Sequence, residues 1–177
     1  NKRSNIPIIK TESDLKLLKG KRVTFGSTSS TSGRLMPQYF LKQAGVETRE
    51  FKGGKAGFSG SHDSTIALVH SGSYEVGVLN EEVWKENKKQ GLVNPNKVEV
   101  IWRTPPYSDY HWLAQSYLDE KFGLGFTNKL TNVLLSFNNE SEKQKRILDL
   151  FGASKFIEAN ESQYYEIEKI GRLIGKI

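Results

Sequence analysis

Hydrophobic and polar positions follow two alternating patterns in the first hundred residues. Short apolar runs typical of buried strands occupy residues 22–25, 74–79 and 98–102. Between them, apolar residues recur at helical spacing over residues 35–44 and 66–70, and Asn80-Glu81-Glu82 begins a further helix. Strands that alternate with helices predict a mostly parallel sheet covered by helices. The expected fold class is therefore α/β.

The pattern changes at Thr104-Pro105-Pro106, where adjacent prolines do not permit a regular helix. We interpret residues 104–112 as a hinge or crossover. Beyond it, three apolar stripes at helical spacing span residues 126–137, 147–151 and 164–174, without a strand pattern. We therefore expect an α/β lobe over residues 1–108, followed by a crossover and helices over 109–177. The stripes of these helices should pack on a surface outside their own segment, or on a second copy of the chain.

A run of six hydroxyl residues, Ser27 to Ser32, lies between Gly26 and Gly33, where the first strand passes into a helix. We call residues 26–33 the hydroxyl loop. A helix start has backbone N–H groups without partners and a partial positive charge, so it can hold an anion. One Ser or Thr would be enough to cap the helix. Six exceed that need, so we favour an oxyanion site at Ser30, Thr31 and Ser32 over a simple cap.

A second polar stretch, Ser59 to Thr65, precedes the next helix. Asp63 is a plausible cap for it, and His62 would lie just outside the helix start, facing a ligand. In open α/β sheets, ligands bind beyond the carboxyl ends of the strands. Asn80 follows one predicted strand, and Tyr107 and Asp109 follow another. These residues complete the candidate site.

Composition excludes several kinds of site. The chain has no cysteine, which excludes disulfides, thiolate metal sites and cysteine nucleophiles. His62, His70 and His111 lack the spacing of a metal site, so neither a metal nor a cofactor is expected. The net charge of +6 raises the question of a nucleic acid partner. The basic residues are dispersed beside acidic ones, however, which indicates a solvated surface instead.

Two enzymatic motifs are also missing. No lysine follows Gly33, as a nucleotide-binding P-loop requires, and the hydroxyl loop contains no Gly-x-Ser-x-Gly. Ser30, His62 and Asp109 have the residue types of a hydrolase triad. A hydroxyl at a helix start lacks the nucleophile elbow, so we expect a binding protein and not an enzyme.

Four motifs at this spacing resemble the phosphonate, phosphite and phosphate-type substrate-binding proteins of ABC importers. They are Lys19-Gly20-Lys21-Arg22-Val23-Thr24-Phe25-Gly26, Ser30-Thr31-Ser32-Gly33 followed by Pro37, Ser59-Gly60-Ser61-His62-Asp63, and Trp102-x-Thr104-Pro105-Pro106. The resemblance runs from about Leu18 to the C-terminus. Residues 104–112, Phe122-Gly123 and Tyr164-Tyr165 are similar to a branch linked to selenate or related oxyanions. The resemblance implies a two-lobed type-2 periplasmic binding fold that closes on its ligand. The 177 residues would be its second lobe and C-terminal helices, without the first lobe.

The resemblance also implies roles for individual residues. Ser30, Thr31 and Ser32 match the oxyanion-binding helix start, and His62 matches the oxyanion-binding histidine. Asp109 falls near an acidic position that contacts substrate, and Glu81 or Glu82 near one that contacts a substrate amine. Phosphate, phosphite and phosphonates keep a proton near neutral pH, and Asp109 is the candidate acceptor for that proton.

The implied protein is an extracytoplasmic receptor, periplasmic or anchored at the cell surface, whose targeting signal lies outside these residues. Its partners would be a small tetrahedral oxyanion and a membrane permease. A receptor for selenate or sulfate, and a ligand-sensing module that signals to another protein, are the alternatives.

Overall fold

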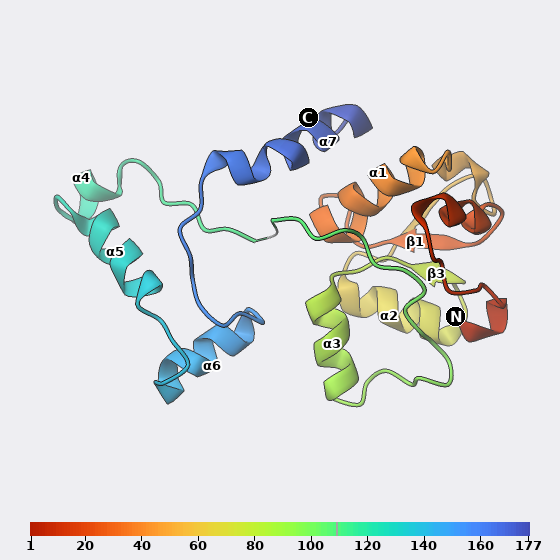
Figure 1. Ribbon diagram of the computed structural model, residues 1–177, viewed down its shortest axis with the longest axis horizontal. Coiled ribbons are helices and arrows are strands. Elements are labelled where there is room, and N and C mark those ends of the chain that lie inside the picture. Colours follow the sequence, from red (N-terminus) through yellow and green to blue (C-terminus); the bar gives the residue numbers. More distant parts are fainter. Residues whose placement is uncertain (109) are drawn as a thin grey trace. The chain divides into compact units, whose positions relative to one another are not determined.

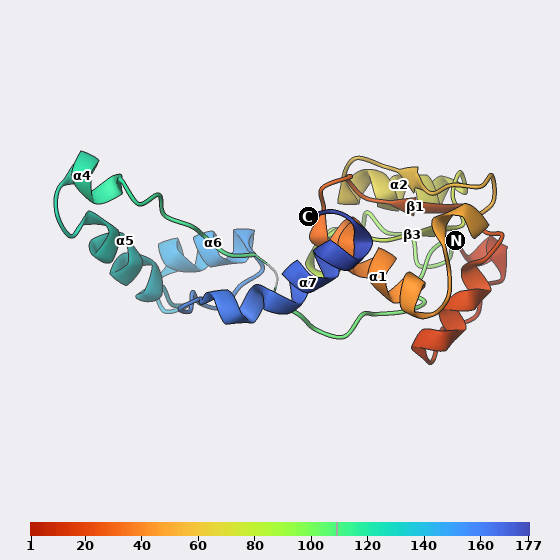
Figure 2. The ribbon, with the colours of Figure 1, turned by 90° about the horizontal axis from the view of Figure 1, so that it is seen from above.

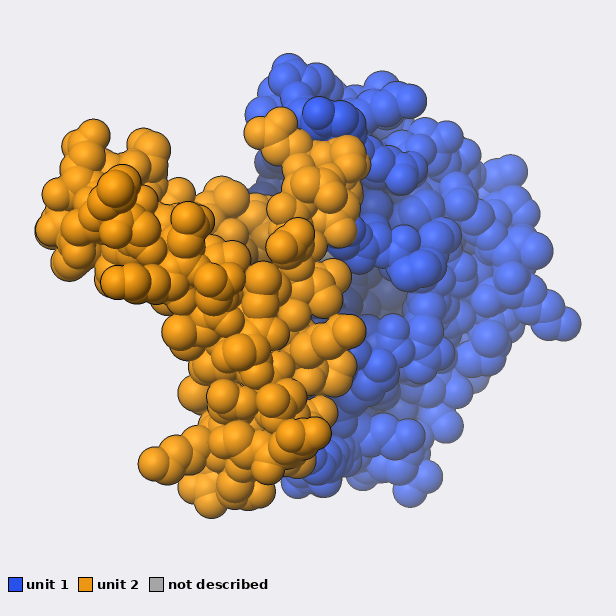
Figure 3. Space-filling model, turned by 60° about the vertical axis from the view of Figure 1, so that its left-hand side comes forward, with its two compact units in different colours: residues 1–109, 165–177 blue, residues 110–164 orange. Residues whose placement is uncertain are grey.

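The computed structural model describes residues 1–108 and 110–177 (Figure 1). Asp109, one of the expected site residues, lies outside the described residues. The chain forms two compact units (Figure 3): the first comprises residues 1–109 and 165–177, and the second residues 110–164.

The first unit is built on a three-stranded parallel sheet with the strand order β2-β1-β3. Its strands are β1 (Val23–Phe25), β2 (Gly57–Phe58) and β3 (Val76–Gly77). Thr24 of β1 is in register with Gly57 on one side and with Gly77 on the other. The predicted parallel sheet is therefore confirmed, although β1 and β3 are shorter than their apolar runs and β2 was not predicted.

The strand predicted over residues 98–102 is wrong, because this segment is extended but belongs to no ladder of the described chain. Ile9 N–H donates to the Ile101 carbonyl at 2.9 Å, which is a single bond and not a strand pairing. The apolar residues of the 98–102 segment are packed against other side chains. Val98 is buried with Ile66 and Val93, and Trp102 packs against Phe40. The apolar pattern of residues 98–102 therefore reflects side-chain burial and not strand pairing.

In the described part of the first unit, four helices and three short 3-10 turns surround this sheet. The helices are α1 (Met36–Gln43), α2 (His62–Ser71), α3 (Glu81–Lys89) and α7 (Tyr165–Ile174). The 3-10 turns are Lys2–Ser4, Glu12–Leu18 and Thr48–Glu50. Helices α1 and α2 lie on opposite faces of the sheet (Figures 1 and 2), as right-handed crossovers require when β2 and β3 flank β1 on opposite sides.

The core of the first unit lies around β1, whose three residues are all buried, with Phe25 fully inaccessible. Phe40 and Leu41 of α1 cover one face of it, and Ile170 of α7 joins the same cluster. The Lys42 ammonium also donates to the Leu173 carbonyl at 3.1 Å. The apolar stripe of α7 therefore packs on α1.

The second unit contains α4 (Leu118–Phe122), α5 (Phe126–Leu135), α6 (Glu142–Leu150) and a 3-10 turn, Glu161–Tyr164. Leu148 is fully buried in this unit. A cluster of aromatic rings, partly exposed at Trp112 and Phe151, is formed by Trp112, Phe137, Phe151 and Phe156. The Asp119 carboxylate accepts the Thr127 N–H at 2.8 Å at the start of α5, and this bond holds the pKa of Asp119 below its usual value. The predicted helices are confirmed.

Candidate functional site

A proline shapes the end of the hydroxyl loop. Pro37 lacks an N–H group, and its ring would collide with a helical carbonyl four residues earlier, at Gly33. The chain therefore makes a wide, π-type turn over Thr31–Leu35, in which Leu35 N–H reaches the Ser30 carbonyl at 3.0 Å. The Gly33 carbonyl turns to the loop and accepts the Gly26 N–H at 2.7 Å. The two ends of the hydroxyl loop are thus closed on each other directly before α1.

Ser30 caps this turn. Its hydroxyl oxygen accepts the Gly33 N–H at 2.9 Å, so the cap interpretation holds for this residue. A hydroxyl that accepts a hydrogen bond can still donate its own proton. Thr31 is half-buried and Ser32 is buried in the same turn. The turn therefore presents hydroxyl groups and first-turn N–H groups at the positive end of the helix.

We expected His62 to lie just before the helix, but it is the first residue of α2. Ser61 is the cap: its backbone is extended, and its hydroxyl accepts the Ser64 N–H at 3.1 Å. The predicted cap at Asp63 is wrong, because Asp63 is already helical and its carboxylate accepts from the Asn87 amide at 2.9 Å. The imidazole is therefore carried by the first turn of the helix.

The His62 ring connects the hydroxyl loop to the end of β3. Its Nδ1 accepts the Asn80 N–H at 3.3 Å, and its Cε1 faces Gly33, where an added Cβ would lie only 3.2 Å away. Nδ1 is thus the hydrogen-bond acceptor of the ring in the contact with Asn80. His62 thus lies between Gly33 of the hydroxyl loop and the Asn80 backbone.

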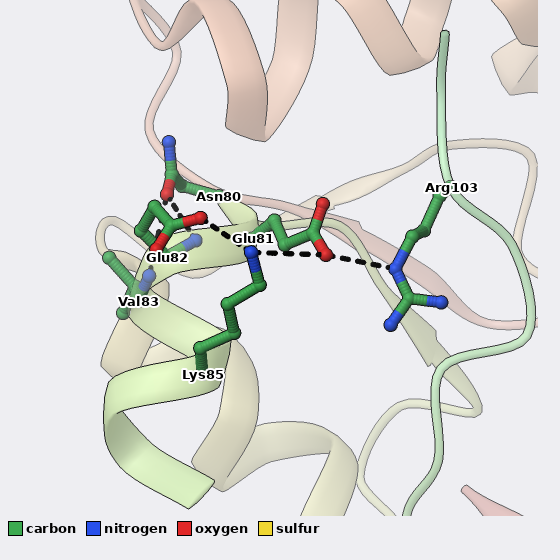
Figure 4. Close-up of polar contacts among 6 residues, drawn as sticks. All are labelled: Asn80, Glu81, Glu82, Val83, Lys85 and Arg103. Carbon is green, nitrogen blue, oxygen red and sulfur yellow. Dashed lines mark hydrogen bonds and ion pairs between the residues drawn. The ribbon is translucent and has the colours of Figure 1, made fainter. Parts of the chain in front are cut away.

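Asn80 is buried at the carboxyl end of β3 and caps α3 (Figure 4). Its side-chain oxygen accepts the Glu82 N–H at 2.8 Å and the Val83 N–H at 3.4 Å. The interpretation of Asn80 as a residue at a helix start is therefore confirmed.

The two carboxylates after Asn80 are paired with cations of the same unit (Figure 4). Arg103 Nε donates to Glu81 at 3.0 Å, and Lys85 Nζ lies 2.7 Å from Glu82 and 3.6 Å from Glu81. The bond from Arg103 lowers the pKa of Glu81, and the bond to Glu82 raises the pKa of Lys85. Both shifts favour the charged forms of Glu81 and Lys85, and each of the two carboxylates has a cationic side chain beside it.

A cavity of about 580 Å³ in the first unit is lined by Ser32, Asn80 and Tyr107 together with mostly apolar residues of β3, α2 and the 98–107 segment. Ser30, Thr31 and His62 are not among its lining residues. The structure thus connects the hydroxyl loop, His62 and Asn80 by direct contacts, and it places Tyr107 on the same cavity as Ser32 and Asn80.

Two features that shape the site were not expected from the sequence. One is the close packing at Gly33, where a Cβ would also meet Ser30 Oγ at 2.9 Å and Gly26 Cα at 3.3 Å. The only sign of this close packing in the sequence is Pro37, four residues after Gly33. The other is Arg34, whose side chain donates to the Thr28 carbonyl at 2.8 Å.

Residues 1–108 and 110–177 contain no group of three His, Asp or Glu side chains arranged to hold a metal ion. None of their helices combines the length and the apolar character needed to cross a bilayer.

Comparison with known proteins supports the motif resemblance. Residues 2–164 match the family described as ABC transporter, phosphonate, periplasmic substrate-binding protein. The chain is 52% identical over 177 residues to the probable ABC transporter phosphite binding protein PhnD1 of Prochlorococcus marinus (strain MIT 9301), covering all of this chain and 60% of that protein.

A solved structure of PhnD1 from Prochlorococcus marinus (MIT 9301), in complex with methylphosphonate, superposes with a TM-score of 0.95 at 52% identity, over all of this chain and 65% of the other. The chain thus spans less than two thirds of the length of these relatives. The fold class is confirmed by this superposition. The family is one of binding proteins and not of enzymes, and the match covers nearly the whole sequence: this chain belongs to the phosphonate periplasmic substrate-binding proteins of ABC transporters.

Proposed function

We propose that this chain forms part of an extracytoplasmic receptor that holds a small phosphorus oxyanion and delivers it to an ABC permease. The observation that carries the proposal is the joining of two helix starts: the hydroxyl loop and His62, the first residue of α2, meet at Gly33, and a helix start carries partial positive charge. The relatives support the ligand class, because one is named as a phosphite binding protein and one is solved with methylphosphonate.

The donors suit a dehydrated oxyanion. A buried polar atom without a hydrogen bond costs several kcal/mol, so each ligand oxygen needs a donor. The hydroxyls of Ser30, Thr31 and Ser32 are neutral donors, His62 is proposed to contact the ligand beside them, and the helix dipole adds partial positive charge. Asn80 and Tyr107 complete the proposed set along the adjoining cavity. Binding and release then require no bond to be made or broken in the ligand.

The substituent on phosphorus is proposed to be small and uncharged. A cationic amine on the ligand would need an uncompensated carboxylate, whereas Glu81 and Glu82 are already paired with Arg103 and Lys85. This pairing favours phosphite and methylphosphonate over aminoalkyl phosphonates. The test is a calorimetric titration with methylphosphonate and 2-aminoethylphosphonate, and tighter binding of the amine would contradict this part of the proposal.

The central experiment removes the hydroxyls of the turn. Thr31→Ala should weaken phosphite binding by about 1–3 kcal/mol, as expected for a hydrogen bond to a charged group. Ser30→Ala should weaken binding and also lower the free energy of unfolding by about 1 kcal/mol, because it removes the cap. Ser29→Ala is the control, since Ser29 is exposed in the same loop and bonds only Ser27 among the described side chains. Unchanged phosphite affinity in the Ser30→Ala, Thr31→Ala double variant would refute the assignment.

A further inference from the structure

Arg34 lies in the π-type turn directly before α1, and its side chain makes three contacts. Its Nη1 donates to the Thr28 carbonyl at 2.8 Å, and its Nε donates to the Gln38 side chain at 3.3 Å. Its guanidinium carbon also lies 4.8 Å from the centre of the Phe58 ring, the distance of a cation–π interaction. The side chain therefore touches the tip of the hydroxyl loop, α1 and the end of β2 at the same time.

These contacts join the two segments that supply the donors. Phe58 ends β2 and is followed by the loop that leads to His62, and that loop is itself bonded to the first one, since Gly60 N–H donates to the Gly26 carbonyl at 3.3 Å. The base of the hydroxyl loop is thus fixed by backbone bonds. Its tip is exposed at Thr28 and Ser29, and Arg34 holds it by a charge-assisted bond.

We propose that Arg34 is a positioning residue for oxyanion binding: it sets the spacing between the hydroxyl loop and the His62 loop without touching the ligand. This inference rests on the proposed function. The planar guanidinium is suited to the task, because its fixed donors can bond Thr28 and Gln38 while its face covers an aromatic ring. Ser30 follows the tip by two residues, so a shifted tip displaces the cap and the first donor of the turn.

Three variants of the chain separate position from charge. Arg34→Gln removes the charge and the fork, and Arg34→Lys keeps the charge alone. Arg49→Gln is the matched control, because Arg49 is exposed in the same unit and its loss changes the net charge equally. Phosphite is titrated into each protein and followed by the backbone amide signals in NMR spectra. The titrations are run at about 0.1 M and about 1 M NaCl, between which the Debye length falls from about 10 Å to about 3 Å.

Arg34→Gln should weaken phosphite binding about tenfold at both salt concentrations, which equals about 1.4 kcal/mol. Arg34→Lys should be nearly as weak, and Arg49→Gln should match the wild type. Three results would each overturn the proposal: wild-type affinity in Arg34→Gln, a loss that disappears at high salt, or full recovery in Arg34→Lys. The last two would show that charge and not position is what Arg34 supplies.

Amide hydrogen exchange without ligand gives an independent reading. In Arg34→Gln the amides of Ser29 and Ser30 should exchange faster than in the wild type and in Arg49→Gln. Unchanged exchange overturns the proposal even if the wild type binds no phosphite. Faster exchange together with no phosphite binding by the wild type supports the positioning role of Arg34 in the loop and refutes the proposed function alone.

Discussion

Gly33→Ala is the sharpest test of how the site is packed. The added methyl would lie 2.9 Å from Ser30 Oγ, 3.2 Å from His62 Cε1 and 3.3 Å from Gly26 Cα. The Ser30 hydroxyl can rotate away, but it then gives up the cap bond to residue 33, at a cost of about 1 kcal/mol. The His62 imidazole and the Gly26 backbone must each move to make room for the methyl group, and such overpacking typically lowers the free energy of unfolding by about 1–3 kcal/mol.

One contribution to the free energy of unfolding acts in the opposite direction and stabilises the variant. The φ angle of Gly33 is not in the left-handed region, so alanine can adopt the native backbone and gains about 0.4–1 kcal/mol by restricting the unfolded chain. The expected result is a net loss of about 1–3 kcal/mol in the free energy of unfolding. Phosphite binding should fall by at least about tenfold, because donors of both loops are displaced.

The measurements are urea denaturation and calorimetric titration of phosphite. Gln43→Ala is the control, since Gln43 is exposed near the end of α1 and away from the loop, and it should unfold and bind like the wild type. If Gly33→Ala also matches the wild type in both measurements, the close approach of Ser30, His62 and Gly26 does not fix the site.

Two other substitutions test charges. Asp109→Asn should reduce the preference for phosphite over selenate in calorimetric titrations, because the proposed acceptor for the ligand's proton loses its charge; an unchanged preference would favour the selenate-type alternative. Asp14 accepts the Thr11 N–H at 2.9 Å, which lowers the pKa of Asp14 in the folded state. The stability that Asp14 adds relative to Asp14→Asn should therefore be complete above the unfolded pKa and disappear as the pH falls through the lowered value. Urea denaturation at a series of pH values measures this, and a stability difference independent of pH would contradict it.

Local patterns predicted most of the first unit. The parallel sheet, the helix after the hydroxyl loop and the helix start at Asn80 all follow from apolar spacing and capping residues. The strand predicted over 98–102 failed because alternation reports which side chains are buried, and it does not report whether the backbone has a neighbour to pair with. The cap of α2 failed because Ser61 and Asp63 are both good cap residues, and the extended backbone at Ser61 decides between them.

The residues of the candidate site were chosen by type and position, and their contacts were predicted less well. Ser30, His62 and Asn80 were expected near one another, and the structure connects them through Gly33 and the Asn80 N–H. The contacts of Arg34 could not be predicted, because a single arginine after a glycine has no pattern that reveals a carbonyl and a ring as its partners. Contacts between residues distant in sequence require the fold.

The position of α7 in the first unit has a consequence for how the protein folds as it is synthesised. Residues 110–164 leave the ribosome before α7 does, yet Ile170 belongs to the core around β1. Domains usually fold in the order in which they emerge, at about 5–20 residues per second. Here the earlier-made unit must wait for its last helix, with the surface of α1 that Ile170 covers left exposed. A chaperone that binds apolar surface would have its longest opportunity in that interval.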